Sequence, residues 1–304
     1  CLCDNFFINP MPDLCNENDG AINLDTYLYT QPSGLTLTGT WTVTDGPGSN
    51  PINGNMFDPT GATEGTYTLT FTLDDQANYC WQAQSVEIVV VRAPIIGVIS
   101  ATPVFCEGLV AQSIVLETLF VGEDEGGTWT ETSTVPSTGT AFDAVAGTFS
   151  TENQIPGIYK FTYTLPADPD GICDGKSIEG EIHIVPNPLA DAGDPGFGCF
   201  GEQVLVGGSS SNGAEFTYEW KNEAGVVVST DRTFNISTSG TYTLTVTNST
   251  TGCIDIDQTT VTIFPDYSAT ILGAEATLID GENSLLTVSV QGIDKTQIDS
   301  YVWT

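Results

Sequence analysis

Positive charge is scarce in this sequence, where six Lys and Arg residues stand against 39 Asp and Glu residues and give a formal net charge of -33. A surface of this sign repels phosphate, which argues against binding to nucleic acid or to anionic lipid. Long apolar runs are also missing, because no stretch approaches the roughly 20 residues that a membrane helix needs. We therefore expect neither a nucleic-acid partner nor membrane insertion.

Residues suited to catalysis are equally sparse, and the single histidine is His183. It alternates with Glu179 and Glu181 along a segment whose other face is rich in Ile, so we expect it on the solvated face of a strand. A general base would need an orienting partner and a nucleophile in a cleft. Nucleophile-elbow, phosphate-loop and dinucleotide-binding motifs are all absent from the sequence. We predict that the chain is not an enzyme.

One pattern recurs three times, as GTYTLTFTL at 65–73, GIYKFTYTL at 157–165 and GTYTLTVTN at 240–248. Apolar residues alternate with polar ones, mostly Thr, and this period of two indicates a half-buried antiparallel strand. Each copy follows a segment with one Trp and lies between an early and a late Cys. The repeated order Cys-Trp-Tyr-Cys favours three similar domains over one large barrel.

Each repeat shows about six or seven short strands and no helical period, which is typical of an immunoglobulin-type β-sandwich. The Trp fits the core tryptophan of that fold, and the Tyr fits its tyrosine corner. We therefore predict an all-β chain of tandem β-sandwiches. The predicted core residues are Trp41, Tyr67, Trp129, Tyr159, Trp220 and Tyr242.

The predicted domains are residues 1–93, 94–187 and 188–265, followed by a partial fourth domain at 266–304. In the fourth, YVW at 301–303 matches YEW at 218–220, but its closing strands are missing, and we interpret the chain as a segment of a longer protein. Prolines near the boundaries and the lack of Gly/Ser linkers predict an extended rod of about 120 Å for three complete domains.

Eight cysteines in an acidic, Thr-rich chain indicate an oxidising compartment. We favour a disulfide within each repeat, because bridges between domains are uncommon. The favoured pairs are Cys15–Cys80, Cys106–Cys173 and Cys199–Cys253. The alternative pairs the early Cys of one repeat with the late Cys of the next, and it applies if the two cysteines of one repeat lie at opposite ends of their sandwich. Cys1 and Cys3 have no counterpart and could join a preceding domain.

The loop ADPDGICDGK is a candidate calcium site, because it places Asp168, Asp170 and Asp174 after a strand, with Gly171 allowing a sharp turn. The simpler interpretation is a turn built from Asp, Pro and Gly.

Two aromatic residues, Tyr79 and Trp81, flank Cys80 near a predicted loop. They could stack on a sugar if exposed, and packing over a disulfide is the alternative.

The segments CNENDGAINLDTYL, GTWTVTDGPGSN and MFDPTGATEGTYTLTFTL resemble the immunoglobulin-like repeats of very large surface proteins of Bacteroidota. Residues 189–264 resemble the PKD-like units of the same proteins. These proteins include SprB-type gliding adhesins, and other gliding-motility-associated proteins, exported by the type IX secretion system. The resemblance covers the whole chain and is specific for the kind of repeat, but it identifies no ligand and no catalytic residue.

The resemblance implies a non-catalytic stalk segment of a secreted cell-surface adhesin or filament. Its partners would be other domains of the same chain, surface glycans, or an outer-membrane secretion or motility complex. The alternative is a set of spacer or carbohydrate-binding modules of a secreted polysaccharide-degrading enzyme.

Overall fold

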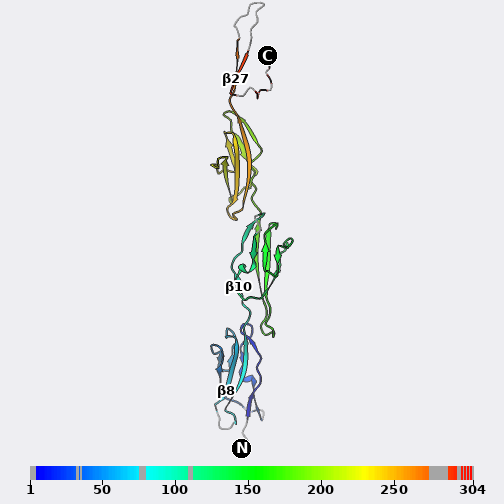
Figure 1. Ribbon diagram of the computed structural model, residues 1–304. Coiled ribbons are helices and arrows are strands. Elements are labelled where there is room, and N and C mark those ends of the chain that lie inside the picture. The colour runs from blue at the N-terminus through cyan, green and yellow to red at the C-terminus, as the bar shows by residue number, and fades with distance from the viewer. Residues whose placement is uncertain are drawn as a thin grey trace, which may run out of the picture. The chain divides into compact units, whose positions relative to one another are not determined.

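The computed structural model describes residues 5–31, 34, 36–74, 80–108, 112–273, 287–292, 296, 298, 300 and 302. Strands are the main regular secondary structure of each repeat (Figure 1), and the described helices are two single 3₁₀ turns, η1 (Leu24–Tyr27) and η2 (Leu116–Leu119). Below, repeats 1, 2 and 3 are residues 1–93, 94–187 and 188–265. Some residues that the sequence analysis names lie outside the described part, namely Cys1, Cys3, Tyr79, Tyr301 and Trp303.

The chain forms two compact units. Unit 1 comprises Cys1–Pro103 and Gly108–Ile184, and unit 2 comprises Val104–Glu107 and Val185–Thr304. This division differs from the four domains of the sequence analysis, because repeat 1 and most of repeat 2 share unit 1. Contacts described below, which include a disulfide, hold these two repeats together.

Repeat 1 has a four-stranded sheet in the order β2-β9-β8-β5, a three-stranded sheet in the order β3-β7-β6 and the pair β1-β4. The strands of the larger sheet are β2 (Leu14–Cys15), β5 (Gly39–Asp45), β8 (Gly65–Leu73) and β9 (Ala83–Val91). The others are β1 (Asn5–Ile8), β3 (Ile22–Asn23), β4 (Leu28–Gln31), β6 (Ile52–Asn53) and β7 (Met56–Phe57). Side chains from the different sheets, such as Phe6, Phe57 and Trp41, share one buried core, as in a β-sandwich.

Repeat 2 has the same plan. Its larger sheet contains β14 (Thr128–Glu131), β17 (Gly157–Leu165) and β18 (Lys176–Val185), with β17 in the middle. Its remaining strands are β10 (Ile96–Ile99), β12 (Ser113–Val115), β13 (Phe120–Glu123), β15 (Phe142–Asp143) and β16 (Thr148–Ser150). They pair as β10-β13 and as β12-β16-β15.

In unit 2, repeat 3 forms a five-stranded sheet in the order β19-β25-β24-β21-β22 and the pair β20-β23. The strands are β19 (Gly196–Cys199), β20 (Val204–Gly207), β21 (Phe216–Asn222), β22 (Val227–Ser229), β23 (Thr233–Ile236), β24 (Gly240–Asn248) and β25 (Ile254–Phe264). Unit 2 also contains β11 (Val104–Cys106) and an antiparallel hairpin of β26 (Ser268–Leu272) and β27 (Thr287–Gln291).

The alternation in the three Gly-x-Tyr strands has a direct structural reason. On β8 the side chains of Tyr67, Leu69, Phe71 and Leu73 are all buried, and the threonines between them face outward. The outward hydroxyls bond across strands, as Thr164 Oγ1 lies 2.9 Å from Ser177 Oγ on the neighbouring strand of repeat 2. Thr therefore suits the outer face both by its β-branched shape and by these cross-strand bonds.

The six predicted core aromatics are all buried, with exposed fractions between 0% for Trp220 and 9% for Trp129. Each Tyr also forms a tyrosine corner, because its hydroxyl donates to a backbone carbonyl four residues earlier. The pairs are Tyr67 with Thr63 O at 2.9 Å, Tyr159 with Ile155 O at 2.9 Å, and Tyr242 with Thr238 O at 3.0 Å. The three repeats thus share one core plan.

The glycine of the repeated GTW segment is required by a close approach. A Cβ on Gly39 would lie 2.6 Å from the ring of Phe71, and one on Gly127 would lie 2.4 Å from the ring of Tyr163. In both repeats the aromatic ring comes from the adjacent Gly-x-Tyr strand. Only glycine leaves room for this ring beside the Trp strand.

Candidate functional site: the disulfide-linked repeat ends

The cysteines join successive repeats. Cys15 of repeat 1 bonds to Cys173 of repeat 2, with a Cα–Cα distance of 5.1 Å, inside unit 1. Cys106 of repeat 2 bonds to Cys253 of repeat 3, with a Cα–Cα distance of 5.5 Å, inside unit 2. The favoured pairs Cys15–Cys80, Cys106–Cys173 and Cys199–Cys253 are therefore wrong. The connectivity is that of the alternative, an early Cys with the late Cys of the next repeat.

Strand geometry explains why a repeat cannot close its own pair. Cys15 lies beside Val91 at the end of β9, because β2 pairs with β9 in parallel. Cys80 comes just before Ala83, where β9 begins. A nine-residue strand spans about 30 Å, whereas a disulfide needs Cα atoms within about 7 Å. The two cysteines of one repeat thus lie near opposite ends of one strand.

Two of the predicted disulfide cysteines need separate comment. Cys80 is disulfide-bonded, and its bond is not to Cys15. Cys199 is a free and exposed thiol, so its assignment to a disulfide with Cys253 is a further correction. The partner of Cys253 is Cys106 instead.

The loop considered for calcium presents the late cysteine of repeat 2. The Asp168 carboxylate accepts backbone N–H groups from Asp170 at 3.0 Å, Ile172 at 2.6 Å and Cys173 at 2.6 Å. These bonds, the one from Cys173 foremost, lower the pKa of Asp168. The side chains of Asp170 and Asp174 are exposed and do not form a cluster with the Asp168 carboxylate. In the part of the chain that the structure describes, no group of three acidic, Cys or His side chains is suited to hold a metal.

Repeat 3 builds the equivalent loop with an amide. The Asn248 side chain accepts the N–H groups of Thr250 at 3.0 Å and Thr251 at 3.2 Å, and the Asn248 N–H donates to the carbonyl of Cys253 at 2.8 Å. In repeat 2 the Asp168 N–H likewise donates to the carbonyl of Cys173, at 3.2 Å. Both loops place Asp or Asn five residues before the late Cys, and both turn at a glycine of positive φ, 72° at Gly171 and 76° at Gly252.

Within unit 1, the disulfide lies in a small buried cluster. Cys15, Ala93 and Cys173 are buried together, and Val91 and Ile172 pack against them. Asn16, the residue after the early Cys, holds the end of repeat 1: its carbonyl Oδ1 accepts the N–H of Ala93 at 2.9 Å. Its own N–H donates to the carbonyl of Val91 at 3.0 Å.

Charged groups reinforce the same junction of repeats 1 and 2. Asp124 of repeat 2 accepts the Ile95 N–H at 2.8 Å and forms an ion pair with Arg92 at 3.0 Å. The Ile95 bond, followed by Arg92, lowers the pKa of Asp124, and Asp124 raises the pKa of Arg92. Lys176 pairs with Glu17 across the junction. These side chains are largely solvated, so each pair contributes at most about 1 kcal/mol.

An open groove of about 750 Å³ runs along this junction and is lined mainly by apolar residues, including Ile96, Val98 and Val121. Two of its charged lining residues, Lys176 and Glu17, pair with each other, and the third, Arg92, pairs with Asp124. No described nucleophile and base converge there. The groove therefore offers a mainly apolar surface with a few charged groups at its edge.

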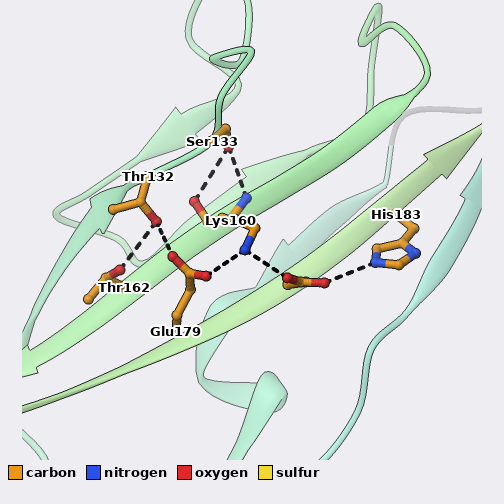
Figure 2. Close-up of polar contacts among 7 residues, drawn as sticks. Thr132, Ser133, Lys160, Thr162, Glu179 and His183 are labelled. Atoms are coloured by element: carbon orange, nitrogen blue, oxygen red, sulfur yellow. Dashed lines mark hydrogen bonds and ion pairs between the residues drawn. The ribbon is translucent and has the colours of Figure 1, made fainter.

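His183 lies on the outer face of the β17–β18 pair, in the chain of polar contacts that Figure 2 shows. Its Nε2 is 3.2 Å from the Glu181 carboxylate, and Lys160 Nζ lies between Glu179 at 2.8 Å and Glu181 at 2.9 Å. The two carboxylates, Glu179 first, raise the pKa of Lys160 to about 12, and Lys160 lowers the pKa of both. Thr132 Oγ1 donates to Glu179, which extends this solvated network to the neighbouring strand segment.

Among the aromatic residues considered for sugar binding, Trp81 is 55% exposed. Its proposed partner Tyr79 lies outside the described residues, and a stacking platform of the two stays a prediction. In the described residues no helix is long and apolar enough to cross a membrane.

No protein-family model matches the chain, and no curated protein matches it. Solved structures that resemble it are multi-domain fragments. Domains 3–5 of the extracellular part of Drosophila OTK match at 12% identity over 86% of this chain and 97% of that one, with a TM-score of 0.33. The I67–I69 I-band fragment of titin matches at 13% identity over 86% and 99%, with a TM-score of 0.38. Immunoglobulin domains 1–5 of Sidekick-1 match at 12% identity over 86% and 58%, with a TM-score of 0.31.

The structure itself defines the class of protein. The chain is a tandem array of all-β, immunoglobulin-like sandwiches, with three tyrosine corners and three buried tryptophans. Disulfides join one repeat to the next in this array.

Proposed function

We propose that this chain is a non-catalytic spacer of a secreted cell-surface adhesin or filament, whose repeats are held in series by covalent bonds. One observation carries the proposal: Cys15–Cys173 and Cys106–Cys253 each join a repeat to the next one. A disulfide within a domain stabilises that domain alone, whereas a disulfide between domains fixes the connection. Such a connection suits a chain that transmits tension.

The bonds shorten the route by which tension passes along the chain. Between residues 15 and 253 the covalent route through both disulfides contains about 70 residues, instead of about 240 along the backbone. Fully extended, these lengths correspond to roughly 240 Å and roughly 830 Å. The repeats could therefore unfold under load without a large gain in length, which supports a role as a tether.

The sequence resemblance supports the finer part of the proposal, a gliding-motility-associated protein of Bacteroidota exported by the type IX system. The partners proposed are neighbouring domains of the same chain, surface glycans, and an outer-membrane secretion or motility complex. Disulfides fit an oxidising, extracellular location, and the net charge of -33 keeps a long exported chain soluble.

Labelling of intact cells tests the location and the linkage together. Antibodies against residues 188–265 should bind unpermeabilised cells, and non-reducing peptide mapping of the labelled protein should recover Cys15–Cys173 and Cys106–Cys253. A protein found only after permeabilisation, with these four thiols reduced, would contradict the proposal. A catalytic domain on the same chain, or specific binding of residues 5–265 to a glycan array, would favour the polysaccharide-enzyme alternative.

A further inference from the structure

Cys199 occupies the position at which repeats 1 and 2 receive a disulfide from the following repeat. We propose that Cys199 is the acceptor of a third bond of the same kind, made with the late cysteine of the repeat that follows Phe264. The inference rests on the proposed function, because it extends the same covalent series by one step. It also assigns a partner to the free thiol found among the described cysteines.

The backbone around Cys199 repeats that around Cys15. β19 pairs in parallel with the end of β25, so that Cys199 lies opposite Phe264. β2 pairs in parallel with the end of β9, so that Cys15 lies opposite Val91. Since Val91 and Phe264 are each the last residue of the closing strand, the two cysteines are at the same place in their sandwiches.

The loop after each early cysteine is also held in the same way. The Cys15 N–H donates to the Asp19 carboxylate at 2.6 Å, and the Cys199 N–H donates to the Glu202 carboxylate at 2.8 Å. An acidic side chain three or four residues later therefore fixes the backbone of each cysteine. Cys199 is held in this way although no bond to it has formed, so its position does not depend on the missing partner.

The surface around Cys199 is apolar and uncovered. Phe197 is 68% exposed, Phe200 69% and Phe264 48%, and the rings of Phe197 and Phe264 stack with centroids 6.3 Å apart. Around Cys15, the residue before the late cysteine, Ile172, packs against the cluster that contains Val91. We infer that the incoming loop covers Phe264 in the same way, which buries an apolar patch that is otherwise in water.

The late cysteines of this chain cannot fill the position, because Cys80, Cys173 and Cys253 are all disulfide-bonded. A second copy of the chain therefore offers no late cysteine either. The β26–β27 hairpin corresponds to the opening pairs β1-β4 and β10-β13 of repeats 1 and 2, which places the start of a further repeat after Phe264. The residues up to Thr304 contain no cysteine after Cys253, so the partner is not among these 304 residues.

The two known late loops specify the chemistry of this partner. It is a cysteine five residues after an Asp or Asn, following a Gly-x-Tyr strand, as in the loops that begin at Asp168 and Asn248. Bond formation removes two protons and two electrons from the two thiols. The acceptor of these electrons is a disulfide of a thiol–disulfide oxidoreductase in the export compartment, which is reduced to its dithiol as the new S–S bond forms.

Peptide mapping of the full-length parent protein tests the proposal. The protein is isolated from the cells that produce it, treated with N-ethylmaleimide under denaturing, non-reducing conditions, and then digested. The Cys199 peptide should be found linked to a cysteine beyond Thr304 that stands five residues after Asp or Asn. A Cys199 peptide alkylated by maleimide in most molecules, or linked to Cys1, Cys3 or another Cys199, would overturn it.

The residue 1–304 chain provides the controls. In that chain the Cys199 peptide should carry maleimide, and Cys199→Ser should remove this labelled peptide from the digest, because the partner cysteine is absent. Recovery of Cys15–Cys173 and Cys106–Cys253 in the same digest separates the two claims. If these two bonds are present in the parent and Cys199 is still free, the further inference fails while the proposed function stands.

Discussion

Replacing Cys15 and Cys173 together by serine removes the disulfide of unit 1 without leaving an unpaired thiol. The disulfide lies where the two repeats meet, because Cys15 and Cys173 are buried with Ala93 at the end of repeat 1. When either repeat unfolds while the other stays folded, the bond closes a loop of about 80 residues in the unfolded part. When both are unfolded, the closed loop corresponds to the full sequence separation of 158.

The chain-entropy model turns these loops into free energies. A loop of about 80 residues corresponds to about 4.5 kcal/mol, and a loop of about 160 residues to about 5 kcal/mol. The disulfide thus stabilises whichever repeat unfolds first by about 4.5 kcal/mol, and the second by only about 0.6 kcal/mol more. With an m-value of about 1.5 kcal/mol/M, the first transition of the serine variant should fall by about 3 M urea.

Hydrogen exchange read by mass spectrometry at increasing urea separates the two repeats, since β8 reports on repeat 1 and β17 on repeat 2. The matched control is the Cys106→Ser, Cys253→Ser variant, which should lower whichever of the β17 and β24 transitions comes first and should leave the β8 transition of repeat 1 unchanged. The reasoning would be refuted by equal shifts of the β8 and β17 transitions. It would also be refuted if the unfolding free energy of the first transition fell by less than about 1 kcal/mol.

Four further outcomes are expected. Tyr159→Phe removes the bond to Ile155 and should lower the unfolding free energy of repeat 2 by about 1 kcal/mol in urea titration; no change would show that the corner is not structural. Asp168→Ala should lower the thermal midpoint of repeat 2 and slow formation of the Cys15–Cys173 bond. Asp168→Asn should do neither, because the Asn248 side chain accepts the backbone N–H groups of the equivalent loop in repeat 3. Because the pKa of Asp168 is lowered, its stabilisation is complete above the unfolded value near 3.9 and is lost as pH falls through the folded pKa; acid titration of wild type against Asp168→Asn measures this loss, and superposable curves would contradict it. In single-molecule pulling, reduction should lengthen the fully extended chain by roughly 600 Å between residues 15 and 253, and equal contour lengths would exclude the bonds from the force path.

The core could be predicted from the sequence because its signals are local. The alternation at Tyr67 to Leu73 fixes which side chains face inward, and the three tyrosine corners need only a hydroxyl and a carbonyl four residues away.

The disulfide connectivity could not be predicted in the same way. A period of two shows which face of the sheet a residue occupies, but it does not show at which end of the sandwich the residue lies. The position of Cys15 depends on the short parallel strand β2, and two residues carry no periodicity. In the acidic loop the Asp168 carboxylate accepts backbone N–H groups, as in the turn of the simpler interpretation, and the calcium site stays a prediction. The useful signal was that Asp168 and Asn248 both stand five residues before a late cysteine.

The order of the bonds along the chain has a consequence for its resistance to proteolysis. Cys15 bonds to Cys173 and Cys106 to Cys253, so the two closed loops overlap in sequence. A protease that cuts the backbone once, anywhere between residues 15 and 253, leaves the two sides joined through at least one disulfide. Pairs confined to single repeats would have left residues 81–105 and 174–198 as stretches where one cut severs the chain. A chain built in this way keeps its two parts attached after a single cut.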